Sequence, residues 1–385
     1  MDNKEQYERE NRGEMPVKNV ILITIDCLRT DHVGCYGYSR NTTPFIDALA
    51  SKGTVFTHFF ANGPFTSAAF PAILSSSYAL DNGKVISLKG RTLVSEILQR
   101  EGITTAGIHS NLYLSSQFGY DRGFDYFEDF LNNAKSKRSP SGLKILAEKI
   151  NDEINTILKK KNFIPLLQKK SLLKNCILLR SIPYSSAEEI TKYAVKWSNN
   201  ISSSFFLWIH YMDLHEPYVI LNTNIPQTYS KSLSRFSQSK VITPTKKSTY
   251  DIFNIYDDKL RYIDSQIQLL HTHIEKEKKD TVMIISSDHG QEIFDHGNFG
   301  HRARYYEEIL HIPLIISGPI IGKEVINRMY SQVDISPTIL SFFTISPPPH
   351  YCGLSLFSES KKMIISESSE PKDLNSKFEH ELNKK

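Results

Sequence analysis

The sequence predicts an α/β protein with a doubly wound, mostly parallel sheet flanked by helices, together with a basic helical insertion. Short apolar runs recur along the chain, and such runs are typical of strands covered on both faces of a sheet. Stretches with apolar residues at helical spacing separate them, which favours a parallel sheet with helices on both sides. The expected strands are NVILITID (19–26), TTAGIHS (104–110), SFFLWIHY (204–211), TVMIISSD (281–288) and IPLIISGP (312–319).

The expected helices lie between these strands. In doubly wound sheets, ligands bind at the carboxyl ends of the strands. Polar residues stand at several of these ends, namely Asp26, His109, His210 and Asp288. The sequence therefore predicts an active site at this edge of the sheet. The helical segments are TPFIDALASKG (43–53), RTLVSEILQREG (91–102), SAEEITKYAVKWSNN (186–200) and YDDKLRYIDSQIQLLHTHIEKEKK (256–279).

A catalytic domain is expected over residues 18–366, between polar tails at 1–17 and 367–385. Two segments inside it break the alternation of strands and helices. Residues 131–185 are rich in lysine and have apolar residues at helical spacing, which favours an inserted helical pair. Its basic face is either simply solvated, or it contacts an anionic substrate or a membrane surface. Residues 221–248 are rich in Ser, Thr and Lys and are expected to form a loop near the site.

The composition is typical of a globular enzyme. The 385 residues are 40% hydrophobic and 23% charged, and the net charge of +4 does not by itself indicate a nucleic-acid partner. The four cysteines contain no CxxC pair, which favours reduced thiols. The amino-terminal segment is too charged for a secretory leader, and no apolar run approaches the ~20 residues of a membrane-spanning helix. We therefore expect a cytoplasmic protein, with peripheral membrane contact through 131–185 as the alternative.

The segment SSDHGQEIFDHGNFGHR (286–302) carries the strongest local signal for a site. Asp288 and His289 end an apolar strand, and Gly290 is expected to allow a sharp turn. A carboxylate beside an imidazole is a common ligand pair for a divalent cation. Acids at strand ends also cap helices, so this pair alone is weak evidence. Asp26 ends a second apolar strand in the same way, and two such acids with a histidine can converge on one metal ion.

A further cluster of ionisable residues lies in WIHYMDLHEPY (208–218), directly after an expected strand. Burial of His210, Asp213 and His215 is costly unless they are paired or bound to a ligand. They are either ordinary surface residues, or metal ligands and acid–base groups around an anionic substrate. Asp213 and His215, with His301 (or His210), are the candidate ligands for a second metal ion; His301 is expected on the loop that follows Asp288 and His289.

The segment NGPFTSAAFPAILSS (62–76) has no charged residue and places Thr66 and Ser67 where a loop meets a helix. The N–H groups at a helix start favour negative charge, so a hydroxyl there is well placed to receive a phosphoryl or sulfuryl group. A metal ion on that oxygen would lower its pKa and make it nucleophilic. Taken alone, the pattern favours a simple helix cap. Its order relative to Asp26 and Asp288 makes Thr66 the best nucleophile candidate, as cap and nucleophile at once.

Together these segments resemble the sulfatase family of the alkaline phosphatase superfamily. The resemblance covers about residues 18–358, with the two insertions as the poorly matched parts. It implies that Asp26, Asp288 and His289 ligate one divalent ion, which is calcium in many sulfatases and manganese, zinc or magnesium in relatives that transfer phosphate groups. It also places Thr66 on the nucleophile position. The matching blocks, in order, are residues 19–62, 102–129, 205–218, 256–319 and 333–343.

The same resemblance implies that His215 lies near the leaving group and that His301 contacts the anion or helps the leaving group depart. Classical sulfatases have a Cys or Ser, oxidised to formylglycine, in a C-x-P-S-R pattern. Thr66 cannot form that aldehyde, and the arginine is missing. Cys27 replaces the paired second acid, and the family's lysine position falls at Ser110 or Asn111. An unmodified threonine resembles instead the phosphoethanolamine and phosphoglycerol transferases of the superfamily, which are membrane-anchored.

The sequence therefore predicts a metal-dependent hydrolase or transferase that acts on phosphate or sulfate esters through a covalent Thr66 intermediate. His215 or His210 would protonate the leaving alcohol. The expected reaction adds or removes such an ester group on a glycan or a lipid. Thr66 favours phosphate over sulfate chemistry. The first alternative is a sulfuric ester hydrolase proper. The second is a non-catalytic member that binds an anionic glycan or lipid through residues 131–185.

Overall fold

A sheet of eight strands forms the centre of the protein in a computed structural model that describes residues 17–81, 88, 90–131, 184–216, 246–358 and 363–368. Its strands are β1 (Asn19–Ile25), β2 (Thr54–Phe60), β3 (Thr104–His109), β4 (Tyr126–Glu128), β5 (Phe205–Tyr211), β6 (Thr281–Ser287), β9 (Leu314–Ser317) and β10 (Glu324–Ser331). They are ordered β10-β2-β9-β6-β1-β5-β3-β4, and β9 alone among them runs antiparallel to its neighbours. The predicted doubly wound, mostly parallel sheet is confirmed.

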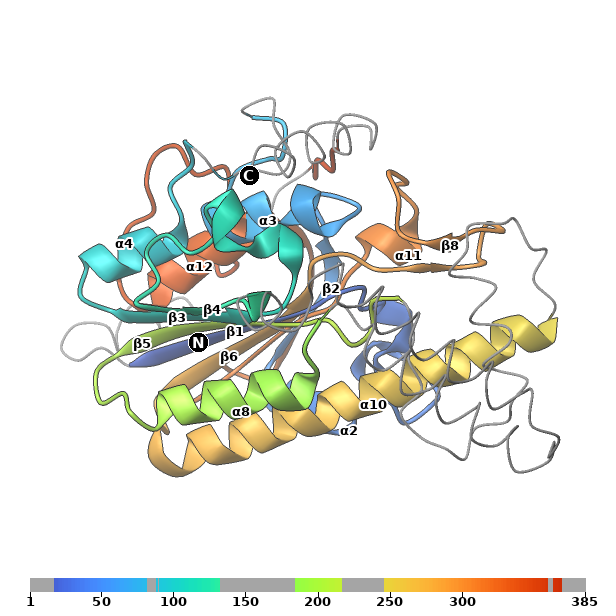
Figure 1. Cartoon of the computed structure of the whole chain (residues 1–385), viewed down its shortest axis with the longest axis horizontal. Coiled ribbons are helices and arrows are strands. Elements are labelled where there is room, and N and C mark those ends of the chain that lie inside the picture. Colours follow the sequence, from blue (N-terminus) through green and yellow to red (C-terminus); the bar gives the residue numbers. More distant parts are fainter. Residues whose placement is uncertain are drawn as a thin grey trace, which may run out of the picture.

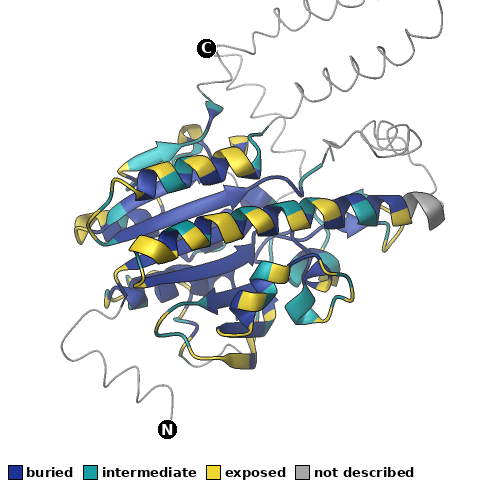
Figure 2. Cartoon of the chain, turned by 90° about the horizontal axis from the view of Figure 1, so that it is seen from below, coloured by how far each residue is buried: buried dark blue, intermediate teal, exposed yellow. Residues whose placement is uncertain are grey.

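Helices cover both faces of this sheet (Figure 1). One face packs against α2 (Pro44–Ala50), α8 (Ala187–Ser198) and α10 (Lys246–Glu277), whose apolar residues share one core cluster with the sheet. The other face packs against α3 (Thr66–Ser75), α4 (Val94–Arg100) and α12 (Ile335–Phe342) through a second cluster. Figure 2 shows α8 and α10 with exposed outer sides over buried strands.

The position of β1 at the centre of the sheet explains why its sequence is apolar throughout. All seven of its residues are buried. Alternate side chains of a strand point to opposite faces, so Ile21 and Ile23 join the cluster under α10 while Val20 and Leu22 join the cluster under α3. Because helices cover both faces, neither set is polar. The carboxyl end of β1 therefore opens between the two helical layers.

Several elements differ from the expected pattern. Strands β2 and β10 were not predicted, because β10 is mostly exposed and polar and β2 is exposed toward its end. Strand β9 lies within the expected strand 312–319 but is antiparallel. Helix α10 begins at Lys246, so the last residues of the expected loop 221–248 are helical.

The remaining elements are short. Most of the expected helical insertion at 131–185, namely residues 132–183, lies outside the described residues. Most of the expected loop at 221–248 lies outside them as well. At the carboxyl end, the Glu367 N–H donates to the Asn62 carbonyl (2.9 Å), so this segment packs against the domain. None of the described helices is both long and apolar enough to cross a bilayer. The short elements are η1 (Thr30–His32), η2 (Gly34–Tyr36), η3 (Leu112–Leu114), η4 (Ser116–Phe118), β7 (Glu292–Ile293), β8 (Phe299–Gly300), α11 (Glu307–Leu310) and η5 (Gln332–Asp334).

Candidate active site

Asp26 is the first residue after β1 and is fully buried. Its N–H donates to the Tyr211 carbonyl at the end of β5 (2.9 Å), so its carboxylate lies where the two strands end. The next residue, Cys27, has a φ of 62°, which is uncommon for a residue other than glycine. The Tyr256 hydroxyl stabilises this turn, because it donates to the Cys27 carbonyl (2.7 Å) and accepts from the Arg29 N–H (2.9 Å).

Asp288 and His289 follow β6, which is a neighbour of β1, and both are buried. The Gln332 amide fixes this strand end by donating to the carbonyls of Ser287 (3.1 Å) and Asp288 (2.6 Å). His289 Nδ1 lies 2.8 Å from the Gly290 carbonyl. A carbonyl only accepts, so Nδ1 carries the proton of the neutral ring and Nε2 is unprotonated. This Nε2 lies 3.4 Å from Asp288 Oδ2.

Two glycines allow backbone segments around the site to approach closely. A Cβ on Gly290 would lie 2.0 Å from the Glu308 carbonyl oxygen, and the Gly290 N–H donates to the Ile309 carbonyl (2.7 Å). A Cβ on Gly63 would lie 2.4 Å from Ala68 Cβ in α3. Gly290 does not have a positive φ. Close packing therefore explains the glycine at this position, and the expected sharp turn stays a prediction.

His210, near the end of β5, points its second ring nitrogen at Asp26. Its Nδ1 lies 2.9 Å from Thr24 Oγ1. This hydroxyl accepts from Trp208 Nε1 (3.1 Å) and donates to the Ile209 carbonyl (3.2 Å). It therefore has only a lone pair left for His210, so Nδ1 carries the proton. Nε2 is then a bare nitrogen 3.4 Å from Asp26 Oδ2.

Thr66 is the first residue of α3, and its hydroxyl joins the same cluster. Oγ1 lies 3.3 Å from Asp26 Oδ2 and 3.4 Å from His289 Nε2. The N-cap of α3 is Phe65, and no side chain caps this helix. The expectation that Thr66 or Ser67 acts as the cap is therefore wrong, because the Thr66 hydroxyl contacts the acidic cluster instead. All residues of α3 are buried, which explains why the segment lacks charge.

The buried cluster fits a divalent cation. Among the described residues, His210 Nε2 and Asp288 Oδ2 are buried without a hydrogen-bond partner, although buried polar atoms are almost always paired. Ligand atoms of Asp26, His210 and Asp288 lie within 4.8 Å of one another. Carboxylate oxygens and neutral imidazole nitrogens are ligands of divalent transition metals. His289 and Thr66 lie beside them as further donors, so the predicted ligand set gains His210.

The ionisable groups in the cluster shift one another's pKa values. Burial opposes the charge on Asp26, but neighbouring imidazoles, with His215 the strongest, hold its pKa well below the ordinary value. Burial and the charge of Asp26 raise the pKa of Asp288 to about 8. Burial lowers the pKa of His289, which keeps this ring neutral. A divalent cation beside Asp288 would instead stabilise its ionised form and so lower its pKa.

His215 and His301 lie next to the cluster. Their ring centroids are 5.0 Å apart, and that of His301 is 4.4 Å from that of His289. Burial lowers the pKa of His215, but the charges of Asp26 and Glu216 outweigh it, so the pKa is raised. Burial lowers the pKa of His301 to about 3. His215 is therefore the better proton donor, and His301 is a neutral imidazole.

Cys27 forms a second close group with His289 and His301. Its Sγ lies 3.4 Å from His301 Nδ1 and 2.8 Å from Asp26 Oδ1. Burial raises the pKa of Cys27 well above its ordinary value, so the group is a thiol. His289 Nδ1 donates to the Gly290 carbonyl and has no lone pair for an ion. The described residues therefore support one ion at the Asp26 cluster rather than a second one here.

Two polar residues identified from the sequence lie outside the cluster. Asp213 is buried, and burial raises its pKa to about 6 although the charge of Lys259 acts in the opposite direction. No group of close metal-ligating atoms within the described ranges includes Asp213, so a second ion around it finds no support there. His109 packs between Phe127 and Trp208, with ring centroids 5.1 Å away on each side.

Asn111 is a site residue whose contact was not predicted. Its Nδ2 donates to Asp26 Oδ2 (3.3 Å) and lies 3.3 Å from Met212 Sδ. It follows β3, so its place just after an apolar run is the signal that could have identified it. Gln291 and Glu216 were also missed, and they are joined by a 2.6 Å hydrogen bond between Gln291 Nε2 and Glu216 Oε2.

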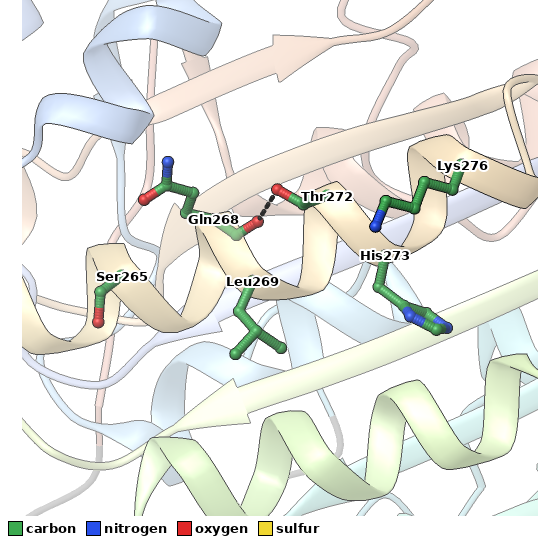
Figure 3. A pocket seen from close by; sticks show the side chains of 6 residues that line it. All are labelled: Ser265, Gln268, Leu269, Thr272, His273 and Lys276. Carbon is green, nitrogen blue, oxygen red and sulfur yellow. Dashed lines mark hydrogen bonds between the residues drawn. The ribbon is translucent and has the colours of Figure 1, made fainter.

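A groove on the outer surface of α10 does not belong to this site. It lies along the carboxyl-terminal half of the helix, which runs toward the amino ends of the strands. Its lining contains no acid, and the hydrogen bond drawn there is local, from Thr272 Oγ1 to the Gln268 carbonyl (2.8 Å). The lining residues are Ser265, Gln268, Leu269, Thr272, His273 and Lys276 (Figure 3).

Sequence comparisons place the chain among sulfatases. The family model described as Sulfatase matches residues 18–345. An arylsulfatase of Clostridium perfringens (strain 13 / Type A) is 24% identical over 374 residues, which cover 88% of this chain and 77% of the arylsulfatase.

Solved structures share the fold. The phosphonate monoester hydrolase of Agrobacterium radiobacter superposes with a TM-score of 0.61 at 18% identity, covering 88% of this chain and 76% of the hydrolase. A protein in complex with its substrate D-glucosamine-2-N,6-O-disulfate gives 0.62 at 16% identity, covering 92% of this chain and 82% of that protein. The zinc complex of the C-terminal periplasmic domain of EcEptC from Escherichia coli gives a TM-score of 0.61 at 14% identity, covering 91% of this chain and 90% of that domain.

Proposed function

The chain belongs to the sulfatase family of ester hydrolases, and we propose that it cleaves phosphate or sulfate esters, as a metal-dependent hydrolase or transferase, through a covalent intermediate on Thr66. The observation that carries this proposal is the position of Thr66 Oγ1, 3.3 Å from Asp26 Oδ2 and 3.4 Å from His289 Nε2. This hydroxyl also stands at the start of α3, where backbone N–H groups favour an anion. A hydroxyl in this setting is placed to attack an anionic ester.

The proposed cofactor is one divalent ion held by Asp26, Asp288, His289 and His210, with Thr66 as a further ligand. When bound, such an ion lowers the pKa of a ligated hydroxyl and neutralises charge on the ester. The mixture of carboxylates and imidazoles favours zinc or manganese over calcium or magnesium, which prefer oxygen ligands. The zinc complex of a fold neighbour supports this choice.

Different residues of the chain are proposed to act as nucleophile and as proton donor. The Thr66 hydroxyl gives its proton to Asp26 Oδ2, which it faces at 3.3 Å, as Oγ1 attacks phosphorus or sulfur in line and the bond to the leaving alkoxide breaks. His215, whose pKa is raised after Asp26 and Glu216 outweigh its burial, donates a proton to that alkoxide. Water or an acceptor hydroxyl then attacks the same atom, the bond to Thr66 Oγ1 breaks, and Asp26 returns the proton to Oγ1. His210 was the other candidate acid, but its bare Nε2 beside Asp26 suits a ligand better.

The substrate is proposed to be a phosphate ester, because an unmodified threonine replaces the aldehyde nucleophile of classical sulfatases. A sulfate ester is the alternative, supported by the arylsulfatase relative. The glucosamine disulfate complex of a fold neighbour supports an anionic glycan as the carrier of the ester. A lipid-linked glycan, membrane contact through 131–185 and a cytoplasmic location stay predictions. A non-catalytic binder is disfavoured, because His210 Nε2 and Asp288 Oδ2 are buried without partners among the described residues.

The test is an activity screen of Thr66→Ala against aryl phosphate, phosphodiester, phosphonate and sulfate esters with zinc, manganese, magnesium and calcium. Ser67→Ala is the matched control, since it removes the neighbouring hydroxyl of the same helix. We expect Thr66→Ala to lose about three orders of magnitude or more in kcat, with fold and metal content retained, and Ser67→Ala to stay within a few-fold. Substantial turnover by Thr66→Ala would overturn the covalent mechanism.

A further inference from the structure

The site contains a hydrogen-bonded chain that the proposed mechanism does not use. It runs from the Glu216 carboxylate through the Gln291 amide to the His301 imidazole. Gln291 Nε2 lies 2.6 Å from Glu216 Oε2, and Gln291 Oε1 lies 2.9 Å from His301 Nδ1. Gln291 is fully buried. None of these residues is a ligand of the proposed metal ion.

The order of donors along this chain is fixed by what each group can do. A carboxylate only accepts hydrogen bonds, so the NH₂ end of Gln291 must face Glu216. The oxygen end of the amide then faces His301, and an amide oxygen also only accepts. His301 Nδ1 must therefore carry a proton. Its Nε2 is left as the ring nitrogen that can exchange a proton with a substrate.

Glu216 also acts on the neighbouring histidine. His215 Nδ1 is hydrogen-bonded to the Glu216 backbone carbonyl, which likewise requires a proton on Nδ1. The two imidazoles, with ring centroids 5.0 Å apart, therefore offer the same nitrogen, Nε2. One residue thus orients His215 through its backbone and His301 through its side chain.

We propose that Glu216 and Gln291 are positioning residues that hold His301 with its proton on Nδ1, so that Nε2 takes part in proton transfer with the substrate. This inference rests on the proposed function. In the release step, His301 Nε2 accepts the proton of the attacking water or acceptor hydroxyl as the bond to Thr66 Oγ1 breaks. The imidazolium keeps its Nδ1 proton, and the Glu216 carboxylate stabilises its charge through the Gln291 amide, as a carboxylate does in other catalytic triads.

The first test measures the tautomer directly, without any substrate. Full-length protein labelled with ¹⁵N-histidine and loaded with Zn²⁺ is studied by long-range ¹H–¹⁵N NMR, and the His301 signals are assigned by their loss in His301→Gln. We expect the Nδ1–H form in the wild type. Gln291→Met keeps the length of the side chain but offers only a weakly accepting sulfur in place of the amide oxygen, so the Nε2–H form should appear in it. An Nε2–H form in the wild type, or an unchanged spectrum in Gln291→Met, would overturn the proposal.

The second test separates positioning from a structural role. Glu216→Gln lets the Gln291 amide turn either way, so it should lower kcat about tenfold or more with the preferred ester while changing KM by less than threefold. Glu308→Gln is the matched control. The Glu308 carboxylate faces His296 at 3.0 Å, and only its backbone carbonyl, which the substitution keeps, contacts Gln291, by accepting from the Gln291 N–H (3.1 Å). Equal kcat in wild type and Glu216→Gln would contradict a role in proton transfer. If no ester is turned over, the proposed function fails, while the NMR result still decides the tautomer.

Discussion

Two buried clusters, one around Asp257 and one around Asp26, place a carboxylate against imidazole but differ in how their polar atoms are paired. Asp257, on α10, accepts hydrogen bonds from His32 Nδ1 (2.8 Å) and the Tyr38 hydroxyl (3.0 Å). It also accepts from Arg40 Nη1 (2.8 Å). Both oxygens of this buried acid are therefore satisfied within the chain, and one of the partners is a permanent cation.

The cluster around Asp26 is incomplete by the same measure. His210 Nε2 and Asp288 Oδ2 have no hydrogen-bond partner among the described residues. Within the same part of the chain, the ion-pair partners of the two acids are histidines, with no Lys or Arg among them. Burying unpaired carboxylates is costly. The comparison teaches that a complete cluster serves the fold, whereas an incomplete one is arranged for a ligand from outside the chain.

The largest expected effect comes from breaking the incomplete cluster. Asp26→Asn removes a ligand carboxylate and a partner of Thr66, so ester turnover should fall by about three orders of magnitude or more. Metal analysis of the purified variant should show less bound zinc or manganese than the wild type, and added Zn²⁺ should no longer raise its Tm. Wild-type metal content and activity in this variant would remove Asp26 from the site.

Breaking the complete cluster should affect stability instead. Asp257→Asn leaves Arg40 and His32 without their carboxylate, and loss of one partner of a buried pair costs about 3–5 kcal/mol. Because hydrogen bonds from His32 and Arg40 outweigh burial and lower the pKa of Asp257, its contribution is present above the unfolded pKa of 3.8 and is lost as pH falls through the folded value. Urea unfolding at several pH values measures this. Metal content should stay at the wild-type level, and its loss would show that the two clusters are not separate.

Asp288→Asn should stabilise the metal-free protein, whereas Asp257→Asn should destabilise the protein. Burial and Asp26 raise the pKa of Asp288 to about 8 from 3.8, so this group's contribution to the metal-free protein is lost as pH rises from about 4 to 8. Asp288→Asn resembles the protonated form and should stabilise the metal-free protein at pH 7 by on the order of a few kcal/mol. Chemical denaturation after chelation measures this gain. With Zn²⁺ present the wild type should become the more stable protein; a destabilised metal-free variant would contradict the account.

The smallest expected effect concerns the turn that presents Asp26. Tyr256→Phe removes the hydroxyl that bridges the Cys27 carbonyl and the Arg29 N–H. Loss of these bonds should cost about 1–2 kcal/mol, because Cys27 has a positive φ that needs support. Thermal unfolding gives the stability change, and the metal affinity of the same variant should fall modestly. Unchanged stability would mean that the turn does not depend on this hydroxyl.

Much of the fold could be predicted because buried parallel strands have a distinctive sequence. NVILITID and TVMIISSD are apolar on both faces and end in acids, so strand direction places Asp26 and Asp288 at the same edge of the sheet. Their contact also depends on β1 and β6 being neighbours. Strand β10 escaped prediction because most of its residues are exposed. The short apolar sequence of β9 does not indicate that this strand is antiparallel to its neighbours.

The finer parts of the site depend on contacts between distant segments. The proposed ligand role of His210 depends on its contact with Thr24 on the adjacent strand β1, and sequence spacing does not reveal which ring nitrogen is protonated. The Thr66 hydroxyl was expected to cap its helix, but the position of β1 and β6 turns it to Asp26 and His289. Asn111 reaches Asp26 through the pairing order of the sheet, which the sequence does not specify.

Anomalous diffraction from crystals of the zinc-loaded protein tests the central claim most directly. The account predicts a zinc peak at bonding distance, about 2 Å, from His210 Nε2 and from carboxylate oxygens of Asp26 and Asp288. Thr66 Oγ1 should face the same peak. A zinc ion bound elsewhere, or at this cluster with His210 Nε2 and Thr66 Oγ1 turned away, would contradict it.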